Sequence, residues 1–593
     1  MENHHQLYRS LCLFFLLILY GCHQDSEPKV VVSNQDNIAF IGGNLCSRMI
    51  NYGFLEASIH EAFPQDSLII RNMCDGGDTP GFRPHSGRKS SWAFDEAIEF
   101  QDELSNPSFN EGHFEYPDEW LTRLDINTII AFFGYAESFQ GEMGIEAFKG
   151  ELQAFIDHTL SQVYDTLYRP QLVLVSPIAF EDLSHLHDLP NGVEQNQNLA
   201  LYTSAIEEVA LSNEVPFVDV FSESKRWFKK KEPLTIDGFQ LNESGYQHLS
   251  RFLMKEIFGI NGKSKPDQHI VDAVKEKNWY WQKDYKIPNG VHVFGRRYDP
   301  FGPDNYPFEL KKIRELTSIR DRNIWATLKG EALDLKAEDE LTSTLPEVET
   351  NFKVGDYGRG EATYLYDDEA LSTFELAEGF EIELFASEKD FPDLANPVQL
   401  SFDNKGRLWV AVMPTYPHYK PGDPSPNDKL LILEDTDGDG RADKQTVAAD
   451  GLHLPIGFEF SPEGIYISQG THLKLLKDLD RDDYYEKSEI ILSGFDDHDT
   501  HHAISAFCAD PSGSIFMGEG IFLHTNVETP YGVVRAHNGG FYRYNPSKKH
   551  LERTAQLTIP NPWGIAFDEW GQPFYLATSG PELHWMSPSQ TKP

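Results

Sequence analysis

The first half of the chain alternates short apolar runs with stretches of helical periodicity. The apolar runs begin at Ile38, Leu68, Thr128, Leu172 and Phe217. Stretches with helical spacing of apolar residues separate these runs at residues 46–62, 144–163 and 194–212. Strands that are apolar on both faces and joined by helices form a parallel sheet that helices cover on both sides. We therefore predict a three-layer α/β domain over residues 36–260.

The second half repeats a different pattern: an apolar strand, a tight turn and a second apolar strand. The turns carry Gly406, Gly464, Gly513 and Gly571, at intervals of roughly 50 to 60 residues, which suits a four-stranded propeller blade with long loops. We predict an all-β propeller over residues 373–593, with three blades and part of a fourth. Because ring closure usually needs 4 to 8 blades, we expect an incomplete propeller and a sequence that is part of a longer chain.

Residues 261–372 show neither the alternation of the first half nor the repeat of the second. They include helical stretches near residues 268–284 and 308–319 and an acidic segment at 341–361. We interpret them as an excursion that packs on the first domain, followed by a linker, in a multidomain protein.

Two acidic loops interrupt the propeller repeats. Each places carboxylates at its positions 1, 3, 5 and 9, where a tight loop turns oxygens onto a hard cation such as Ca²⁺. The glycine expected at position 6 is present in the first loop (Gly440), whereas Asp483 stands there in the second, and no Glu at position 12 supports an EF-hand. We predict calcium sites, with solvated acidic turns as the alternative. The predicted ligands are Asp435, Asp437, Asp439, Asp443, Asp478, Asp480, Asp482 and Glu486.

The net charge of the chain limits the kinds of partner that it can bind. The chain has 593 residues, 51 basic and 93 acidic, for a formal net charge of -42. Such a field repels phosphate, which excludes nucleic acid and anionic lipid as partners.

The N-terminus predicts export. Residues 1–22 join a polar start to an apolar run that is too short to span a bilayer, followed by Leu-Tyr-Gly-Cys22. This ending resembles a bacterial lipobox, which implies lipidation of Cys22 and a protein attached to the bacterial membrane through that anchor only. An ordinary signal peptide or a short anchor is the alternative. After cleavage three cysteines remain besides Cys22, namely Cys46, Cys74 and Cys508. These are too few for a disulfide-built scaffold, and without a Cys-x-x-Cys-His motif we expect no covalent haem.

Four stretches of the α/β region resemble the SGNH (GDSL-type) hydrolases, which have a flavodoxin-like three-layer fold. These stretches are residues 42–45 (Gly-Gly-Asn-Leu), 75–78 (Asp-Gly-Gly-Asp), 134–137 (Gly-Tyr-Ala-Glu) and 237–240 (Asp-Gly-Phe-Gln). The family carries a Ser nucleophile, a Gly and an Asn that donate to an oxyanion hole, and an Asp-x-x-His. The resemblance maps these positions onto Asn44, Gly77, Ala136, Asp237 and Gln240.

At three of these positions the residue present cannot perform the catalytic role that the family requires there. An Asn44 amide cannot act as a nucleophile, Ala136 donates no hydrogen bond, and Gln240 cannot take up a proton near neutral pH. We predict that ester hydrolysis is absent and that the domain is structural or binds a ligand. Cys46 or Ser47 is the alternative nucleophile. A cleft at the sheet edge would suit a polar ligand such as a sugar, lined by Asn44, Asp78, Glu137, Ser138, Asp237 and Gln240.

Residues 374–387, the stretch from Asn396, the acidic loops and the Asp-Thr-His-His stretch that ends at His502 resemble the membrane-bound dehydrogenase domain family. That family is a branch of six-bladed propellers related to quinoprotein glucose dehydrogenases. The resemblance implies pyrroloquinoline quinone (PQQ), a cytochrome c as electron acceptor, His502 as the base for a substrate hydroxyl and Glu519 as its orienting acid. Alternatively, His498, His501 and His502 are metal ligands or loop histidines with structural hydrogen bonds.

The combined prediction is an exported surface lipoprotein. Its degenerate hydrolase domain would be joined to a dehydrogenase-like propeller that oxidises a sugar or polyol. The alternatives are a non-catalytic carbohydrate-binding or scaffold protein, and an esterase with an unconventional nucleophile.

Overall fold

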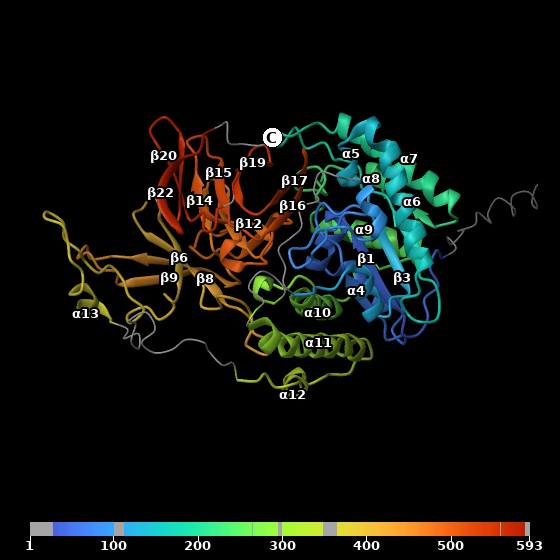
Figure 1. The fold of residues 1–593 in the computed structure, drawn as a ribbon, viewed down its shortest axis with the longest axis horizontal. Helices are drawn as coiled ribbons and strands as arrows, with labels where there is room; N and C mark the ends of the chain where they lie inside the picture. The colour runs from blue at the N-terminus through green and yellow to red at the C-terminus, as the bar shows by residue number, and fades with distance from the viewer. Residues whose placement is uncertain are drawn as a thin grey trace, which may run out of the picture.

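The structure is a computed structural model that describes residues 28–99, 112–263, 265–293, 299, 301–347, 365–557 and 559–587. The predicted signal peptide and Cys22 lie outside the described residues. An α/β domain and an all-β domain lie side by side, with two long helices beneath their junction (Figure 1).

The N-terminal domain is built on a five-stranded parallel sheet with the strand order β2-β1-β3-β4-β5. The central strands are buried on both faces, because every residue of β3 and nearly every residue of β1 is apolar or small. This order and these helical layers confirm the predicted flavodoxin-like α/β class. The strands are β1 (Asn37–Gly42), β2 (Ile69–Asn72), β3 (Thr128–Phe132), β4 (Gln171–Val175) and β5 (Phe217–Val218).

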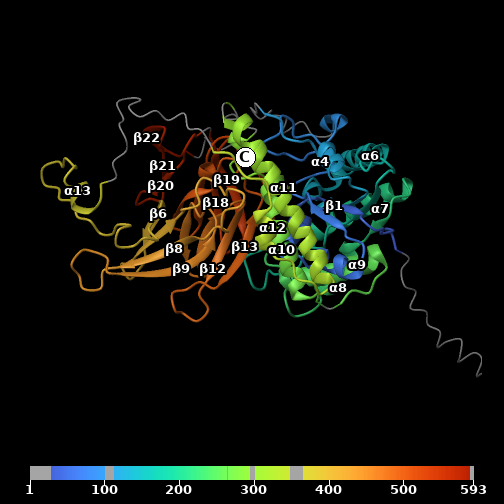
Figure 2. The ribbon, with the colours of Figure 1, turned by 90° about the horizontal axis from the view of Figure 1, so that it is seen from below.

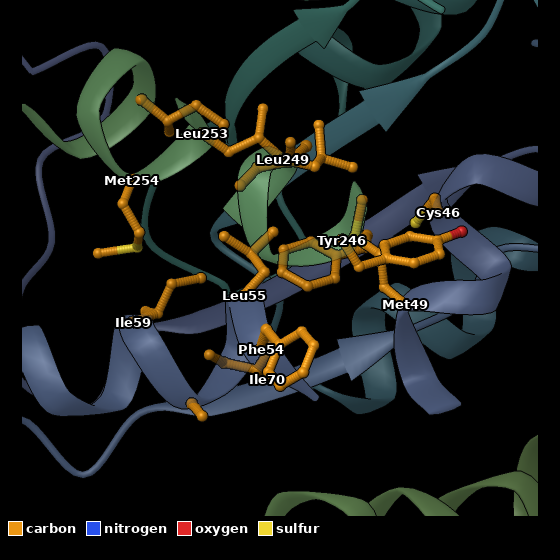
Figure 3. Packing of buried hydrophobic residues seen from close by; sticks show 14 of the residues in the cluster. Cys46, Met49, Phe54, Leu55, Ile59, Ile70, Tyr246, Leu249, Leu253 and Met254 are labelled. Carbon is orange, nitrogen blue, oxygen red and sulfur yellow. The ribbon is translucent and has the colours of Figure 1, made fainter. Parts of the chain in front are cut away.

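Helices cover both faces of this sheet. On one face α3 and α9 pack together, with Leu55 and Ile59 facing Leu249 and Leu253 in a buried apolar cluster (Figure 3). Cys46 and Cys74 form a disulfide that links α2 to the segment after β2. The helices of this domain are α2 (Asn44–Ser47), α3 (Phe54–Ala62), α4 (Pro117–Arg123), α5 (Tyr135–Ser138), α6 (Ile145–Ser161), α7 (Val193–Ser212), α8 (Val220–Trp227) and α9 (Glu243–Phe258).

The excursion after α9 extends the same domain. Helix α10 (Gln268–Tyr285) lies along the sheet edge, where the Trp281 Nε1 group donates to the Asn72 carbonyl at 2.8 Å and the Lys277 ammonium donates to the Ile70 carbonyl at 2.9 Å. Helix α11 (Phe301–Leu328) packs against α10 (Figure 2). The short helices α12 (Leu335–Glu340) and α13 (Asp367–Leu371) follow. Within the described residues, no helix combines the length and apolar character needed to cross a membrane.

The C-terminal domain consists of small antiparallel sheets in a partial propeller. Among the described residues, three of these sheets have four strands and the last has three. The blades are β6 to β9, β10 to β13, β14-β15-β18-β19, and β20 to β22. Their strands are β6 (Pro397–Phe402), β7 (Leu408–Val412), β8 (Asp428–Glu434), β9 (Lys444–Leu452), β10 (Phe458–Ser461), β11 (Gly464–Gln469), β12 (His472–Lys477), β13 (Lys487–Ser493), β14 (Ser505–Ala509), β15 (Ile515–Glu519), β18 (Gly540–Asn545), β19 (His550–Gln556), β20 (Gly564–Phe567), β21 (Pro573–Ala577) and β22 (Gly580–Trp585).

The repeated turn has a local cause. In the first blade, the Gly406 N–H donates to the Asp403 carbonyl at 3.0 Å, and Gly406 has a φ of 78°, which favours glycine. The Asp403 carboxylate also accepts main-chain N–H groups of the turn. The third and fourth blades repeat this arrangement at residues 510–513 and 568–571.

One element was not predicted. A hairpin of β16 (His524–Thr529) and β17 (Gly532–His537) is inserted in the third blade between β15 and β18, which pair directly with each other. The hairpin lies at the junction with the α/β domain (Figure 1). It brings the propeller to the carboxyl edge of the parallel sheet.

Candidate functional site

The hydrolase-like positions lie together at the carboxyl edge of the sheet. The Asn44 Nδ2 group lies 3.4 Å from Gln240 Oε1, and the Gln240 Nε2 group donates to Asp237 Oδ2 at 2.6 Å. Asn44 follows β1, and the other two lie in the loop before α9. The chain Asn44, Gln240, Asp237 has the connectivity of a Ser-His-Asp triad, but amides stand where the nucleophile and the base are required.

A glutamate of the propeller domain occupies the position of the oxyanion hole. Glu528 of β16 places Oε1 2.8 Å from the Asn44 main-chain nitrogen and 2.7 Å from that of Gly77, and both N–H groups donate to it. Ala136 lines the same small cavity and contributes only a methyl group. The two N–H donors thus survive, and an internal carboxylate fills the space where a substrate oxyanion would lie.

Burial has the largest influence on the pKa of the Glu528 carboxyl group. Glu528 is 2% exposed, and desolvation raises its pKa to about 7. The N–H groups of Asn44 and Gly77 and the charge of Arg535 oppose this rise, while the charge of Asp75 adds to it.

The cleft is too small for the sugar predicted from the sequence. Asn44, Asp78, Glu137 and Glu528 line a cavity of about 20 Å³, which has room for about one water molecule. The β16–β17 hairpin covers this edge of the sheet, and the carbohydrate site predicted here stays a prediction. The alternative nucleophile Cys46 has no thiolate to offer, since its sulfur is bonded to Cys74.

The predicted dehydrogenase residues have separate partners. His502 is 2% exposed, with Nδ1 2.9 Å from the Ile521 carbonyl and Nε2 3.1 Å from Asn561 Oδ1. The carboxylate beside it is that of Asp499, whose Oδ2 lies 3.3 Å from His502 Nδ1. Burial lowers the pKa of His502. Both ring nitrogens therefore face protein oxygens, which suits a structural role.

Glu519 points into the blade. Its carboxylate accepts hydrogen bonds from the hydroxyl groups of Thr525 and Tyr542, the latter at 2.7 Å. Burial raises the pKa of Glu519 to about 8. The acid that contacts the histidine pair is Asp499, and Glu519 belongs to a separate buried network.

A larger cavity lies along the inner strands β6, β14 and β20 of the propeller. Its volume is about 630 Å³, within the range of small-molecule sites. His501, rather than His502, contributes to its wall, and Asp499 Oδ1 lies 2.7 Å from His501 Nδ1. The wall includes Asn396, Tyr416, His501, Ser505, Phe507 and Trp563.

The histidine pair could also hold a metal. Asp499, His501 and His502 present ligand atoms within 4.8 Å of one another. The Nδ1 atom of His502 is directed at the Ile521 carbonyl, so this ring would have to turn before binding a metal.

The acidic loops occupy equivalent places, between the third and fourth strands of the first two blades. In each, three predicted ligands come together: Asp435, Asp437 and Asp443 in the first, and Asp478, Asp480 and Glu486 in the second. Asp439 and Asp482 instead accept main-chain N–H groups two residues ahead. In the second loop, Asp483 takes the place of the expected glycine with a φ of 70° and binds Arg407.

Sequence reasoning missed Glu528 and the aromatic residues of the pocket. A Thr-Pro-Tyr-Gly turn between two β-prone runs at residues 524–537 signals a hairpin. No local signal connects that hairpin to Asn44, because the contact depends on how the two domains pack.

Comparisons with known proteins divide the chain in the same way. The family model described as Domain of unknown function (DUF7133) matches residues 366–592. No curated protein matches the chain significantly.

Solved structures are similar to part of the chain. A catalytic mutant of an acetylxylan esterase from Geobacillus stearothermophilus is 13% identical, with a TM-score of 0.27, and the match covers 38% of this chain and 96% of that one. A putative GDSL-like lipase from Parabacteroides merdae is 13% identical, with a TM-score of 0.28, and the match covers 39% and 100%. With scores this low, the fold assignment rests on the strand order and layers described above.

Proposed function

We propose that this protein binds a neutral polyhydroxylated compound, such as a carbohydrate, in the propeller cavity, and that its hydrolase-like domain is a non-catalytic support. The observation that carries this proposal is the contrast between the two sites. The hydrolase-like cleft is filled by Glu528 and leaves about 20 Å³, whereas the propeller cavity offers about 630 Å³.

The wall of the propeller cavity suits a sugar. Trp563 and Tyr416 are 49% and 42% exposed, so their rings are accessible to the apolar face of a sugar ring. Trp563 is held in place because its Nε1 group donates to the His501 carbonyl at 3.1 Å. Asn396 and Ser505 add hydrogen-bonding groups to the wall.

The same wall argues against the quinone predicted from the sequence. PQQ is a tricarboxylate, and its recognition calls for Arg or Lys side chains. Among the described residues, no Arg or Lys lines this cavity. The net charge of -42 adds a further penalty for an anionic ligand. The residues present do not fit PQQ, and we assign no step to it.

Oxidation of a bound alcohol is the second candidate, favoured by one observation. His501 lies on the cavity wall with Asp499 2.7 Å from its Nδ1 atom, an arrangement in which the imidazole can accept a hydroxyl proton and the carboxylate steadies the imidazolium. The hydride would pass to a diffusible two-electron acceptor of the quinone class. Saccharide-dependent dye reduction by the protein, lost in His501→Ala, tests this candidate.

We also propose that the two acidic loops bind Ca²⁺. In each loop the clustered carboxylates are exposed or half-exposed and lie in a turn whose N–H groups bind the first Asp. A cation in either loop would hold together the third and fourth strands of that blade.

Calorimetric titration with neutral mono- and oligosaccharides tests the binding proposal. Trp563→Ala should weaken binding at least tenfold, because the stacking surface is lost. Trp570→Ala is the matched control, since Trp570 is 78% exposed on the turn between β20 and β21 and lies outside the cavity wall. No saccharide binding by the folded protein, or equal loss in both variants, would contradict the proposal.

A further inference from the structure

The Glu528 carboxylate joins two domains through main-chain donors. The acceptor atom belongs to the propeller hairpin, and the donors belong to two separate loops that follow β1 and β2 of the hydrolase-like domain. These two loops meet only at the carboxyl edge of the sheet. The contact therefore depends on the α/β fold, the hairpin and the packing between them.

Other contacts set the hairpin against the same edge. The Arg535 Nη2 group donates to the Gly77 carbonyl at 2.7 Å, and the Tyr135 hydroxyl donates to the Thr529 carbonyl at 2.8 Å. A Cβ atom on Gly77 would lie 2.1 Å from Asn526 Oδ1, so this approach requires glycine. The hairpin and the Gly76-Gly77 turn thus have complementary shapes.

Removal of the carboxylate would leave the donors buried. Asn44 is 1% exposed, and Gly77 lies in a buried segment. Buried N–H groups without an acceptor are costly, and their hydrogen bonds to an ionised acceptor are stronger than those to a neutral one.

From these contacts we propose that Glu528 is an internal ligand that fastens the propeller to the hydrolase-like domain through the N–H groups of Asn44 and Gly77. The pair has become a carboxylate receptor for the chain's own hairpin. It holds the domains in one arrangement and keeps other anions out of the cleft. This inference is independent of which ligand the propeller cavity binds.

Chemical rescue of Glu528→Ala tests the proposal. The variant removes the carboxylate and leaves room for acetate beside the two donors. In the full chain, sodium acetate should raise the thermal midpoint of Glu528→Ala progressively with concentration, and sodium chloride of equal ionic strength should not. The wild type and Glu528→Gln, in which the place is filled, should show no acetate-specific rise.

A second glutamate provides the control. Glu459 also accepts a main-chain N–H group, from Ala509 at 2.8 Å, but both residues belong to the propeller. Glu459→Ala should not respond to acetate. An absent acetate effect in Glu528→Ala, or an equal effect in Glu459→Ala, would overturn the proposal. If Glu528→Ala does not fold, the same comparison is made on its refolding yield with acetate or chloride.

The amide chemical shifts of the wild type and of Glu528→Gln provide an independent test. Amide protons that donate to a carboxylate resonate downfield, so the Gly77 and Asn44 amide signals should move upfield together in Glu528→Gln. Unchanged amide shifts at both positions would show that Glu528 is not their acceptor and would overturn the proposal.

Discussion

As the pH rises, the free energy of unfolding of the Glu528→Gln variant should increase relative to that of the wild type. Burial raises the pKa of Glu528 from an ordinary value of 4.5 to about 7, so the folded state holds this proton more tightly than the unfolded state does. The stabilisation from the bound proton is fully present below pH 4.5 and is lost as the pH rises through about 7. At 1.36 kcal/mol per pKa unit, the wild type should lose about 2 to 3 kcal/mol relative to the glutamine variant between about pH 5 and 8.

Urea unfolding of both proteins at several pH values measures this difference. The glutamine keeps an acceptor oxygen for the two N–H groups and removes only the titration. Glu340→Gln, at the exposed end of α12, is the control for the removal of one carboxylate from the chain. A constant difference between wild type and Glu528→Gln across this pH range, or one of opposite sign, would refute the electrostatic argument.

Three further changes have defined outcomes. Lys277→Met should cost about 3 to 5 kcal/mol in urea unfolding, because the buried Glu56 loses the ammonium that lies 2.6 Å from it, and a second change of Glu56→Gln should recover part of that loss. Ca²⁺ should raise the thermal midpoint of the chelator-treated protein, and combined Asp435→Asn and Asp478→Asn changes should abolish the rise; an undiminished response would place the ions elsewhere. Asn44→Ser with Gln240→His should still fail to hydrolyse p-nitrophenyl acetate, because Glu528 fills the anion site, and turnover above background would show that the cleft is open.

Patterns with a local cause could be predicted from the sequence. The parallel sheet follows from strands such as β3, in which five consecutive residues are buried. The propeller blades follow from a repeated turn in which a Gly N–H donates to an Asp carbonyl, at Asp403 and again at Asp510. The two acidic loops also form by local hydrogen bonds, which is why their carboxylates cluster near the predicted positions.

Features that depend on packing between distant segments could not be predicted. The sequence places Asn44, Gln240 and Asp237 at hydrolase positions, but it gives no indication that Glu528 would seal the cleft. For the same reason the sequence does not indicate that His501, rather than His502, lines the propeller cavity. Adjacent residues in a short helical turn point in different directions, and only the assembled inner strands decide which of them faces the cavity.

Hydrogen exchange measured by mass spectrometry, with and without a bound neutral saccharide, tests the central claim most directly. The ligand should slow exchange in the segments 396–400, 501–507 and 563–565, which contain residues of the cavity wall, and should leave residues 42–45 and 75–78 unchanged. Slower exchange at 42–45 and 75–78, with none along the inner strands, would place the ligand in the hydrolase-like cleft and contradict the account.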